Sequence, residues 1–186
     1  MNNTFGQRLV NARKIRCMSQ RDLSESVGKK VSPTAIAKYE KGQMMPSSDV
    51  LIALAHALGM SLDYFFRPFT VAIDATKFEF RKKSSIGRKK IVAIEHLVSS
   101  EIEKYIEIEG VLGITAKFNL DYRNTVVEGP DDARTLAMRL RKDLNIGNDA
   151  VVSAVDLLES VGVKIIEIEE DDSFSGTCNE ARGLPI

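Results

Sequence analysis

Apolar residues recur every three or four positions in the first third of the chain, which predicts short amphipathic helices. The most informative stretch is residues 19–42, where two helices of about eight residues are expected. Ser19 is placed to cap the first helix, and Asp22 three residues later forms a variant of the capping box. Gly28 is placed to end this helix.

The second helix of this pair has equally clear start and stop signals. Ser32 is a typical N-cap, and Pro33 suits the first helical position because no backbone N–H is needed there. Gly42 ends this helix, and the turn that joins the two helices carries Lys29 and Lys30. Two short helices joined in this way predict a helix-turn-helix.

The flanking segments extend the pattern to a small bundle. Helices are expected over residues 4–16 and 49–58, and a last short one begins at Ser61. Five helices in about 65 residues can bury an independent core.

The run from Ser19 to Phe66 resembles the lambda-repressor-like (XRE) helix-turn-helix family, through SQRDL, VSPTAIAKYEKG, MMPSSDVLIALAHALG and SLDYFF in that order. The resemblance implies a five-helix DNA-binding bundle, with a recognition helix at about Pro33–Lys41 in the major groove of double-stranded DNA. By the same resemblance, base edges are contacted by Pro33, Thr34, Ala37 and Lys38. Phosphates are expected to be held by Arg13, Gln20, Lys29, Lys30 and Ser32. Small side chains on this face suit thymine methyl groups, and Lys38 can reach guanine.

Charge divides the chain more sharply than its neutral total suggests. Residues 1–90 carry 17 basic and 7 acidic side chains, whereas residues 91–186 carry 9 and 19. A basic half suits phosphates and an acidic half is repelled by them. The alternative is that both halves are simply solvated surfaces.

The middle of the chain predicts a strand or connecting arm over residues 69–80, followed by a strongly basic run at residues 81–90. That run is either a second phosphate-contacting patch or a solvated linker. A long helix is expected over residues 87–112, ended by Gly113. Its apolar positions fit three imperfect heptads, so it either packs within one subunit or forms a dimer seam. The proposed heptad positions are Ile91, Ile94, Val98, Tyr105, Ile108 and Leu112.

The last third predicts two helices and a strand. The first helix begins near Asp131, and the second spans residues 149–160. Residues 163–169 alternate as a half-buried strand, and FSGTC at residues 174–178 is a second candidate. The expected buried stripes are Ala133, Leu136, Ala137, Leu140 and Leu144, then Val151, Val152, Val155 and Leu158.

Residues 80–186 resemble the amino-terminal part of ImmA/IrrE-like zinc peptidases fused to XRE-type domains, through DARTLAMRLRKDLNIG, VVSAVDLLESVGVKIIEIE and FSGTCNEARGLPI. That family binds zinc through H-E-x-x-H, which this sequence lacks. This sequence has two histidines: His56 is expected in the bundle, and His96 on a solvated helix face. The chain as given is therefore expected to be no enzyme and to hold no metal or cofactor. Zinc would belong to a longer parent, and the chain is either a fragment or a natural short form.

These observations predict a mainly α fold: the five-helix bundle, a linker, a long helix and a truncated α+β region. The expected parts are a helix-turn-helix domain at 1–67, a basic linker or strand arm at 68–90, a long helix with its connection at 91–125, and a partial ImmA/IrrE-like domain at 126–186. Cys17 and Cys178 are expected to be reduced thiols in a cytoplasmic protein of a bacterium or phage, with no membrane segment.

The leading functional hypothesis is a sequence-specific, repressor-like regulator of transcription that binds double-stranded DNA, with a homodimer as one expected assembly. The alternatives are a piece of an XRE-fused zinc metallopeptidase that cleaves a regulator, and an antitoxin-like interaction module.

Overall fold

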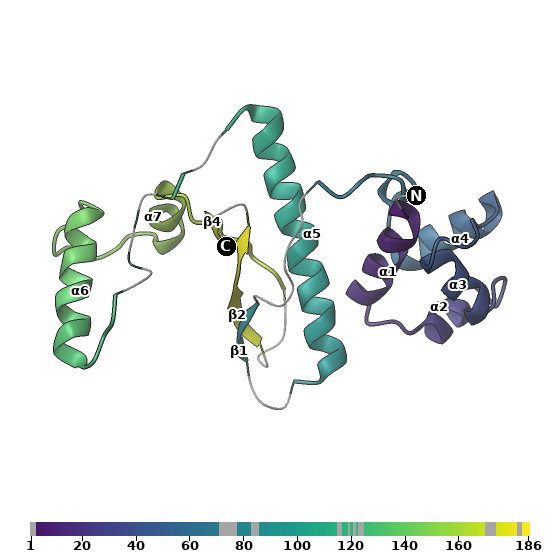
Figure 1. The fold of residues 1–186 in the computed structure, drawn as a ribbon, viewed down its shortest axis with the longest axis horizontal. Coiled ribbons are helices and arrows are strands. Elements are labelled where there is room, and N and C mark those ends of the chain that lie inside the picture. Colours follow the sequence, from purple (N-terminus) through teal and green to yellow (C-terminus); the bar gives the residue numbers. More distant parts are fainter. Residues whose placement is uncertain are drawn as a thin grey trace.

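The computed structural model is mainly helical, as expected, and its described residues also form two small antiparallel sheets of two strands each (Figure 1). It describes residues 3–70, 78–82, 86–114, 117, 118, 120, 122, 125–169, 174–181 and 184–186. The helices are α1 (Thr4–Ile15), α2 (Gln20–Ser26), α3 (Pro33–Glu40), α4 (Ser48–Leu58), the 3₁₀ turn η1 (Asp63–Phe65), α5 (Arg88–Leu112), α6 (Pro130–Asp143) and α7 (Ala154–Ser160). The strands are β1 (Glu79–Lys82), β2 (Phe174–Cys178), β3 (Glu180–Ala181) and β4 (Leu184–Pro185).

Local capping determines where the two central helices begin. The Ser19 hydroxyl accepts a hydrogen bond from the Asp22 backbone N–H at 3.1 Å, and the Asp22 carboxylate accepts one from the Ser19 N–H at 2.7 Å. This reciprocal pair satisfies two donors that the start of α2 would otherwise leave unbonded. The Ser32 hydroxyl caps α3 in the same way, accepting from the Ala35 N–H at 3.2 Å. The predicted capping signals are confirmed.

The four helices α1 to α4 and η1 enclose one apolar core. It consists of Phe5, Leu9, Ala12, Leu23, Val27, Val31, Ile36, Tyr39, Leu54, Ala55, Leu58 and Phe65. Burying each large apolar side chain contributes about 1.5–3 kcal/mol, which makes this cluster the main source of the bundle's stability.

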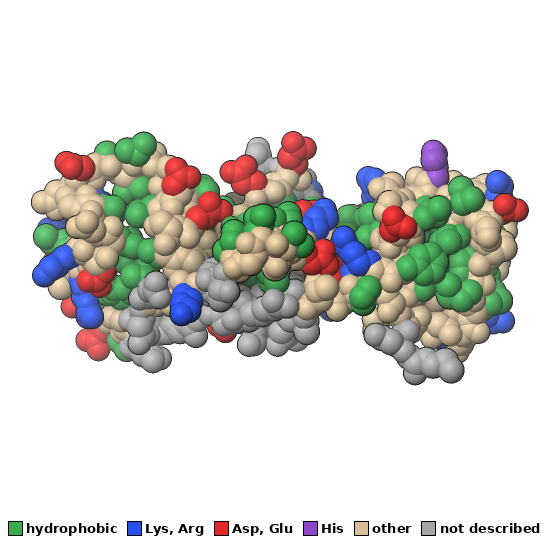
Figure 2. All heavy atoms as spheres, turned by 90° about the horizontal axis from the view of Figure 1, so that it is seen from above, with side chains coloured by type: hydrophobic (Ala, Val, Ile, Leu, Met, Phe, Trp, Pro, Cys, Tyr) green, Lys and Arg blue, Asp and Glu red, His purple; other side chains and the backbone are tan. Residues whose placement is uncertain are grey.

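Helix α5 lies between the bundle on one side and the β1–β2 sheet on the other (Figure 1). At 25 residues and 1.5 Å per residue it is about 37 Å long. Phe78 and Ile86 pack on its buried stripe, which consists of Ile94, Val98, Ile102 and Ile106. Of the proposed heptad positions, Ile94 and Val98 are buried within this chain, whereas Ile108 and Leu112 are exposed. Packing within one subunit therefore accounts for only part of the heptad pattern, and a dimer seam stays a prediction. Figure 2 shows hydrophobic side chains gathered over the C-terminal end of α5, in the middle of the face drawn.

The sheet joins segments that are far apart in the sequence. β1 pairs with β2 antiparallel, with Glu79 opposite Cys178 and a bulge between Arg81 and Lys82. The predicted strand at FSGTC is therefore confirmed. The strand or arm predicted at 69–80 enters the sheet only at its end, because β1 begins at Glu79, and residues 71–77 lie outside the described part.

The last third departs from the sequence prediction in three respects. Both helices form, but α7 begins at Ala154 and not at residue 149, so the second helix is shorter than predicted. No residue of α6 or α7 is buried, and Val151 and Val152 before α7 are exposed, so the expected buried stripes are wrong. Residues 163–169 do not pair as a strand among the described residues, although the Lys164 N–H donates to the Pro185 carbonyl at 3.0 Å. A strand requires a partner for its ladder of hydrogen bonds, and alternation alone does not supply one.

None of the described helices is long and apolar enough to cross a membrane.

Candidate nucleic-acid interface

The outer face of α3 gathers the side chains predicted to contact bases. Thr34 and Lys38 are exposed and Ala37 is half-buried, at the i, i+3, i+4 spacing that places them on one side of a helix. Pro33, at the first helical position, is half-buried beside them. On the opposite side Ile36 is fully buried in the bundle core. The helix therefore presents a narrow face of small groups and one ammonium to solvent.

The basic turn before α3 is equally accessible. Lys29, Lys30 and Ser32 are exposed, and within the described part of the chain neither lysine forms an ion pair. Lys29 has a φ of 59°, a left-handed conformation that non-glycine residues adopt only occasionally. It is held there by a backbone hydrogen bond to the Ser24 carbonyl at 2.9 Å.

The last residue of α3 ties the recognition helix to α1 and α2. The Glu40 carboxylate accepts from Arg13 at 2.6 and 3.0 Å and from the Gln20 amide at 2.7 Å. Arg13 also donates to the Met18 carbonyl, and Asn3 donates to the Glu40 carbonyl at 2.8 Å. These bonds fix the position of α3 relative to the start of α2.

Arg13 is thus placed differently from the sequence prediction. Its side chain and that of Glu40 are each only 8% exposed, so the guanidinium expected to hold a phosphate is occupied inside the bundle. Gln20 remains half-buried at the surface, although its amide nitrogen is already bonded to Glu40.

A buried ion pair joins the bundle to α5. Arg8 on α1 donates to both carboxylate oxygens of Glu103 at 2.6 and 2.8 Å, and the two side chains are 0% and 3% exposed. Arg8 also donates to the carbonyls of Arg67 and Pro68, and Glu103 accepts from the Thr70 N–H. Burial opposes the charge on Arg8, but the hydrogen bonds and the field of Glu103 prevail and raise its pKa.

Sequence reasoning missed this pair, although one signal was present. Arg8 lies three residues after Phe5 and four before Ala12, within the apolar stripe of α1, and Glu103 lies between Ile102 and Ile106. A charged residue inside a buried stripe is rare unless it is paired, so each position indicated a partner elsewhere.

His96 belongs to the same junction, and the expectation that it lies on a solvated face is wrong. It is half-buried, and its Nδ1 lies 2.6 Å from the Asn11 side-chain oxygen, while the Asn11 amide nitrogen donates to the Tyr64 hydroxyl at 2.8 Å. Burial, followed by repulsion from Lys14 and Arg13, lowers the pKa of His96 below 6.5. The other histidine, His56, is exposed on α4.

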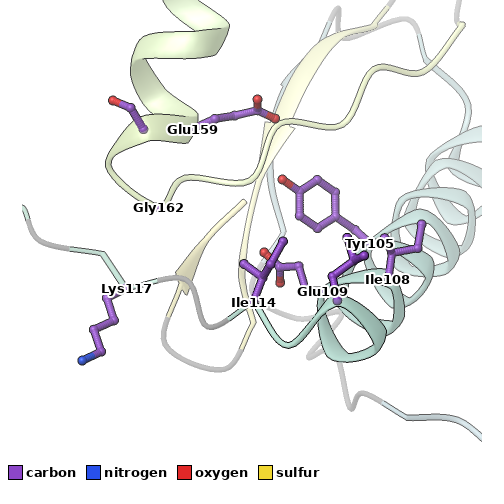
Figure 3. Close-up of a pocket in the computed structure, with 9 residues that line it drawn as sticks. Tyr105, Ile108, Glu109, Ile114, Lys117, Glu159 and Gly162 are labelled. Carbon is purple, nitrogen blue, oxygen red and sulfur yellow. The ribbon is translucent and has the colours of Figure 1, made fainter.

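A separate hollow of about 480 Å³ lies at the far end of α5, beside α7 (Figure 3). Tyr105 and Glu109 on α5 line one side and Glu159 on α7 the other, whereas the labelled Lys117 side chain points away from them. Nearby Lys164 is 2% exposed, bonded to Glu109 at 2.5 Å. None of the residues predicted to contact DNA lines this hollow.

Comparison with known proteins supports the helix-turn-helix in the first third of the chain. A family model described as helix-turn-helix matches residues 11–65. The chain is similar to the crystal structure of the clp gene regulator ClgR from Corynebacterium glutamicum, at 18% identity and a TM-score of 0.32, over 61% of this chain and 94% of that one. No curated protein matches the sequence.

The predicted XRE-type helix-turn-helix is confirmed by the family match, which supports a DNA-binding regulator of transcription. The likeness of residues 80–186 to ImmA/IrrE-like peptidases stays a prediction.

Proposed function

We propose that the chain is a sequence-specific, repressor-like regulator that inserts α3 into the major groove of double-stranded DNA. The observation that carries the proposal is that the outer face of α3 is exposed while the helix itself is held in place by hydrogen bonds to α1 and α2. Thr34 and Lys38 are exposed, while Glu40 at the end of the same helix is held by Arg13 and Gln20. A helix positioned in this way can present its side chains to base edges in one register.

The chemistry of the outer face suggests what is read. The Lys38 ammonium can donate to the O6 and N7 atoms of guanine, and the methyl groups of Thr34 and Ala37 can contact the methyl group of thymine. We assign phosphate contacts to Gln20, Ser32, Lys29 and Lys30. Arg13 is left out because its guanidinium is both bonded to Glu40 and buried, whereas Gln20, which also donates to Glu40, remains half-buried at the surface.

We also propose that two copies bind together. One helix of eight residues reads only a few base pairs, whereas two copies would read half-sites about 34 Å apart, one turn of DNA. A twofold-related sequence among selected DNA sites would support this assembly.

The direct experiment is selection of binding sites from random duplexes, followed by affinity measurements over a salt series. Affinity for the selected site should fall steeply with salt, with log K decreasing by about 0.9 per log unit of salt for each neutralised phosphate. Absence of binding, or binding indifferent to salt, would refute the proposal.

Single substitutions separate the two kinds of contact. Lys38→Ala should cost about 1–3 kcal/mol at one base position and relax the preference there. Gln20→Ala should weaken binding to all sequences alike. The charge-matched control for Lys38→Ala is Lys142→Ala, which removes an exposed lysine of α6. A uniform loss with Lys38→Ala would instead make Lys38 a phosphate contact.

For residues 80–186 we keep the ImmA/IrrE-like proposal as a statement about fold. The order of α6, α7 and the alternating segment 163–169 supports it. No peptidase activity is attached to these 186 residues, because the sequence lacks H-E-x-x-H. The reading frame beyond Ile186 tests the link: an H-E-x-x-H in the following codons would make the parent a metallopeptidase, and a stop codon would exclude it.

A further inference from the structure

A basic hollow lies where the first turn of α5 meets the end of α1 and the start of α2. Its volume is about 480 Å³. The charged, hydroxyl and amide side chains that line it beside the buried Arg13 are Lys14, Ser19, Gln20, Arg88 and Lys89. Three helices thus contribute to one cationic surface, and α5 is not part of the helix-turn-helix.

The cations of this hollow are available to a ligand. Within the described part of the chain, neither Lys14 nor Arg88 forms an ion pair. Lys89 lies 3.4 Å from the Asp22 carboxylate, but the two side chains are 64% and 48% exposed. Such a solvated pair contributes little to stability, so a phosphate can replace Asp22 as the partner of Lys89.

The first turn of α5 is held in place against α2 by contacts farther along the helix. Glu103 is bonded to Arg8 and His96 to Asn11, both on α1. Because α1 and α2 share one core, these bonds also fix Arg88 and Lys89 relative to Ser19 and Gln20. The basic side chains are therefore not carried on a free arm.

Charge along α5 indicates which end faces a polyanion. The helix begins with Arg88, Lys89 and Lys90, whereas acidic residues follow at positions 95, 101, 103, 107 and 109. Only the first turn would be attracted by DNA, and the rest of the helix would be repelled from it.

We propose that this hollow, formed by Arg88 and Lys89 of α5 with Lys14, Ser19 and Gln20, binds a phosphate of the DNA backbone next to those contacted by the helix-turn-helix alone. The inference rests on the proposed function. Gln20 belongs both to the hollow and to the proposed phosphate contacts of the helix-turn-helix, so the two surfaces are continuous. Arg88 can hold two oxygens of one phosphate, and Lys89 adds a point charge.

The structure also divides the basic run of residues 81–90 into two parts. Arg81 lies on β1, in the sheet, whereas Arg88 and Lys89 lie beside α2. Only the second part belongs to the proposed phosphate site.

The test is the salt dependence of binding to the selected duplex by the full chain. We expect Arg88→Ala/Lys89→Ala to lower the slope of log K against log salt by about 0.9 per phosphate lost. One lost phosphate corresponds to about eightfold weaker binding at 0.1 M salt, taking 1 M as reference. Arg88→Lys/Lys89→Arg should keep the wild-type slope, and preference at the base read by Lys38 should not change.

A matched control lies on the same helix. Lys104→Ala removes an exposed lysine of α5 that pairs with Glu101 at 2.7 Å, about 22 Å along the helix from Lys89. It should leave the slope unchanged. Equal slopes for wild type and the Arg88→Ala/Lys89→Ala variant, or an equal loss with Lys104→Ala, would overturn the inference. Weaker binding with an unchanged slope would also overturn it, because that result indicates a structural role.

Two further arms separate the remaining outcomes. Inorganic phosphate is titrated into the DNA-free protein while the Ser19 and Gln20 amide resonances are followed. Saturable shifts lost in the Arg88→Ala/Lys89→Ala variant would make the hollow a site for free anions and overturn the proposal, whereas absence of such shifts supports DNA as the source. If the wild type binds no DNA, the proposed function itself fails; if it binds with Lys38-dependent preference and only the slope effect is absent, this inference alone fails.

Discussion

Removing the Glu103 carboxylate should strongly destabilise the protein, because it leaves Arg8 charged and buried. In Glu103→Ala the guanidinium keeps its bonds to the carbonyls of Arg67 and Pro68 but loses both bonds to the carboxylate. The Thr70 N–H loses its bond to Glu103 as well.

The magnitude follows from burial. Breaking a buried ion pair from one side costs about 3–5 kcal/mol, and here the side chains are 0% and 3% exposed. Folded domains are stable by about 5–15 kcal/mol, so the loss is a large share of the total. At about 2–4 °C per kcal/mol for a chain of this size, the melting temperature should fall by roughly 6–20 °C.

Thermal and urea unfolding followed by circular dichroism measure this effect. Glu101→Ala is the control, because its pair with Lys104 is solvated and worth about 0–1 kcal/mol. Arg8→Met/Glu103→Leu should recover only part of the loss, since it removes both charges but leaves two carbonyls without their donor. A Glu103→Ala effect no larger than that of Glu101→Ala would refute the reasoning.

Two other substitutions test the bundle and its junction with α5. Glu40→Ala leaves Arg13 without its carboxylate partner and should lower the free energy of unfolding by about 3–5 kcal/mol. The same variant should weaken DNA binding to all sequences. The control Glu25→Ala, which removes an exposed carboxylate of α2, should do neither. Because the pKa of His96 is lower in the folded protein, the unfolded chain protonates this imidazole at a higher pH than the folded protein does. The stability contributed by neutral His96 is therefore complete above about pH 6.5 and declines as pH falls through the lowered pKa. In urea unfolding between pH 7.5 and 5, His96→Gln should remove part of this decline and His56→Gln should not; identical pH profiles for wild type and His96→Gln would contradict the assignment.

The helix-turn-helix was predictable because its signals are local. Ser19 and Asp22 bond to each other across three residues, and the Ser32 hydroxyl accepts from the Ala35 N–H at the start of α3. The apolar period then determines which side of α3 faces the core, and hence that Lys38 faces outward.

The ion pairs were not predictable in detail because their partners are remote in the sequence. Arg8 and Glu103 are 95 residues apart, and Arg13 and Glu40 are 27 apart. A pattern along the chain can mark a charge inside an apolar stripe, but only the packed bundle determines which opposite charge meets it. For this reason the sequence predicts a phosphate contact for Arg13, whereas the structure pairs it with Glu40.

The amphipathic helices of the last third show a different limit. Periodicity indicated which side of α6 is apolar, yet it does not determine whether another element covers that side. Leu136 is half-buried and Val152 is fully exposed. Similarly, residues 163–169 alternate as a strand would, but pairing requires a neighbouring strand with free backbone groups.

The buried pair between α1 and α5 bears on how this protein could be recombined with others. A DNA-reading bundle attached by a loose tether can be exchanged between regulators as a cassette. Here a transplanted bundle that carried Arg8 into a chain without a carboxylate at position 103 would bring along an uncompensated buried cation. Chimeras with a junction between Pro68 and α5 should therefore fold poorly, whereas those that move the bundle together with α5 should keep it intact.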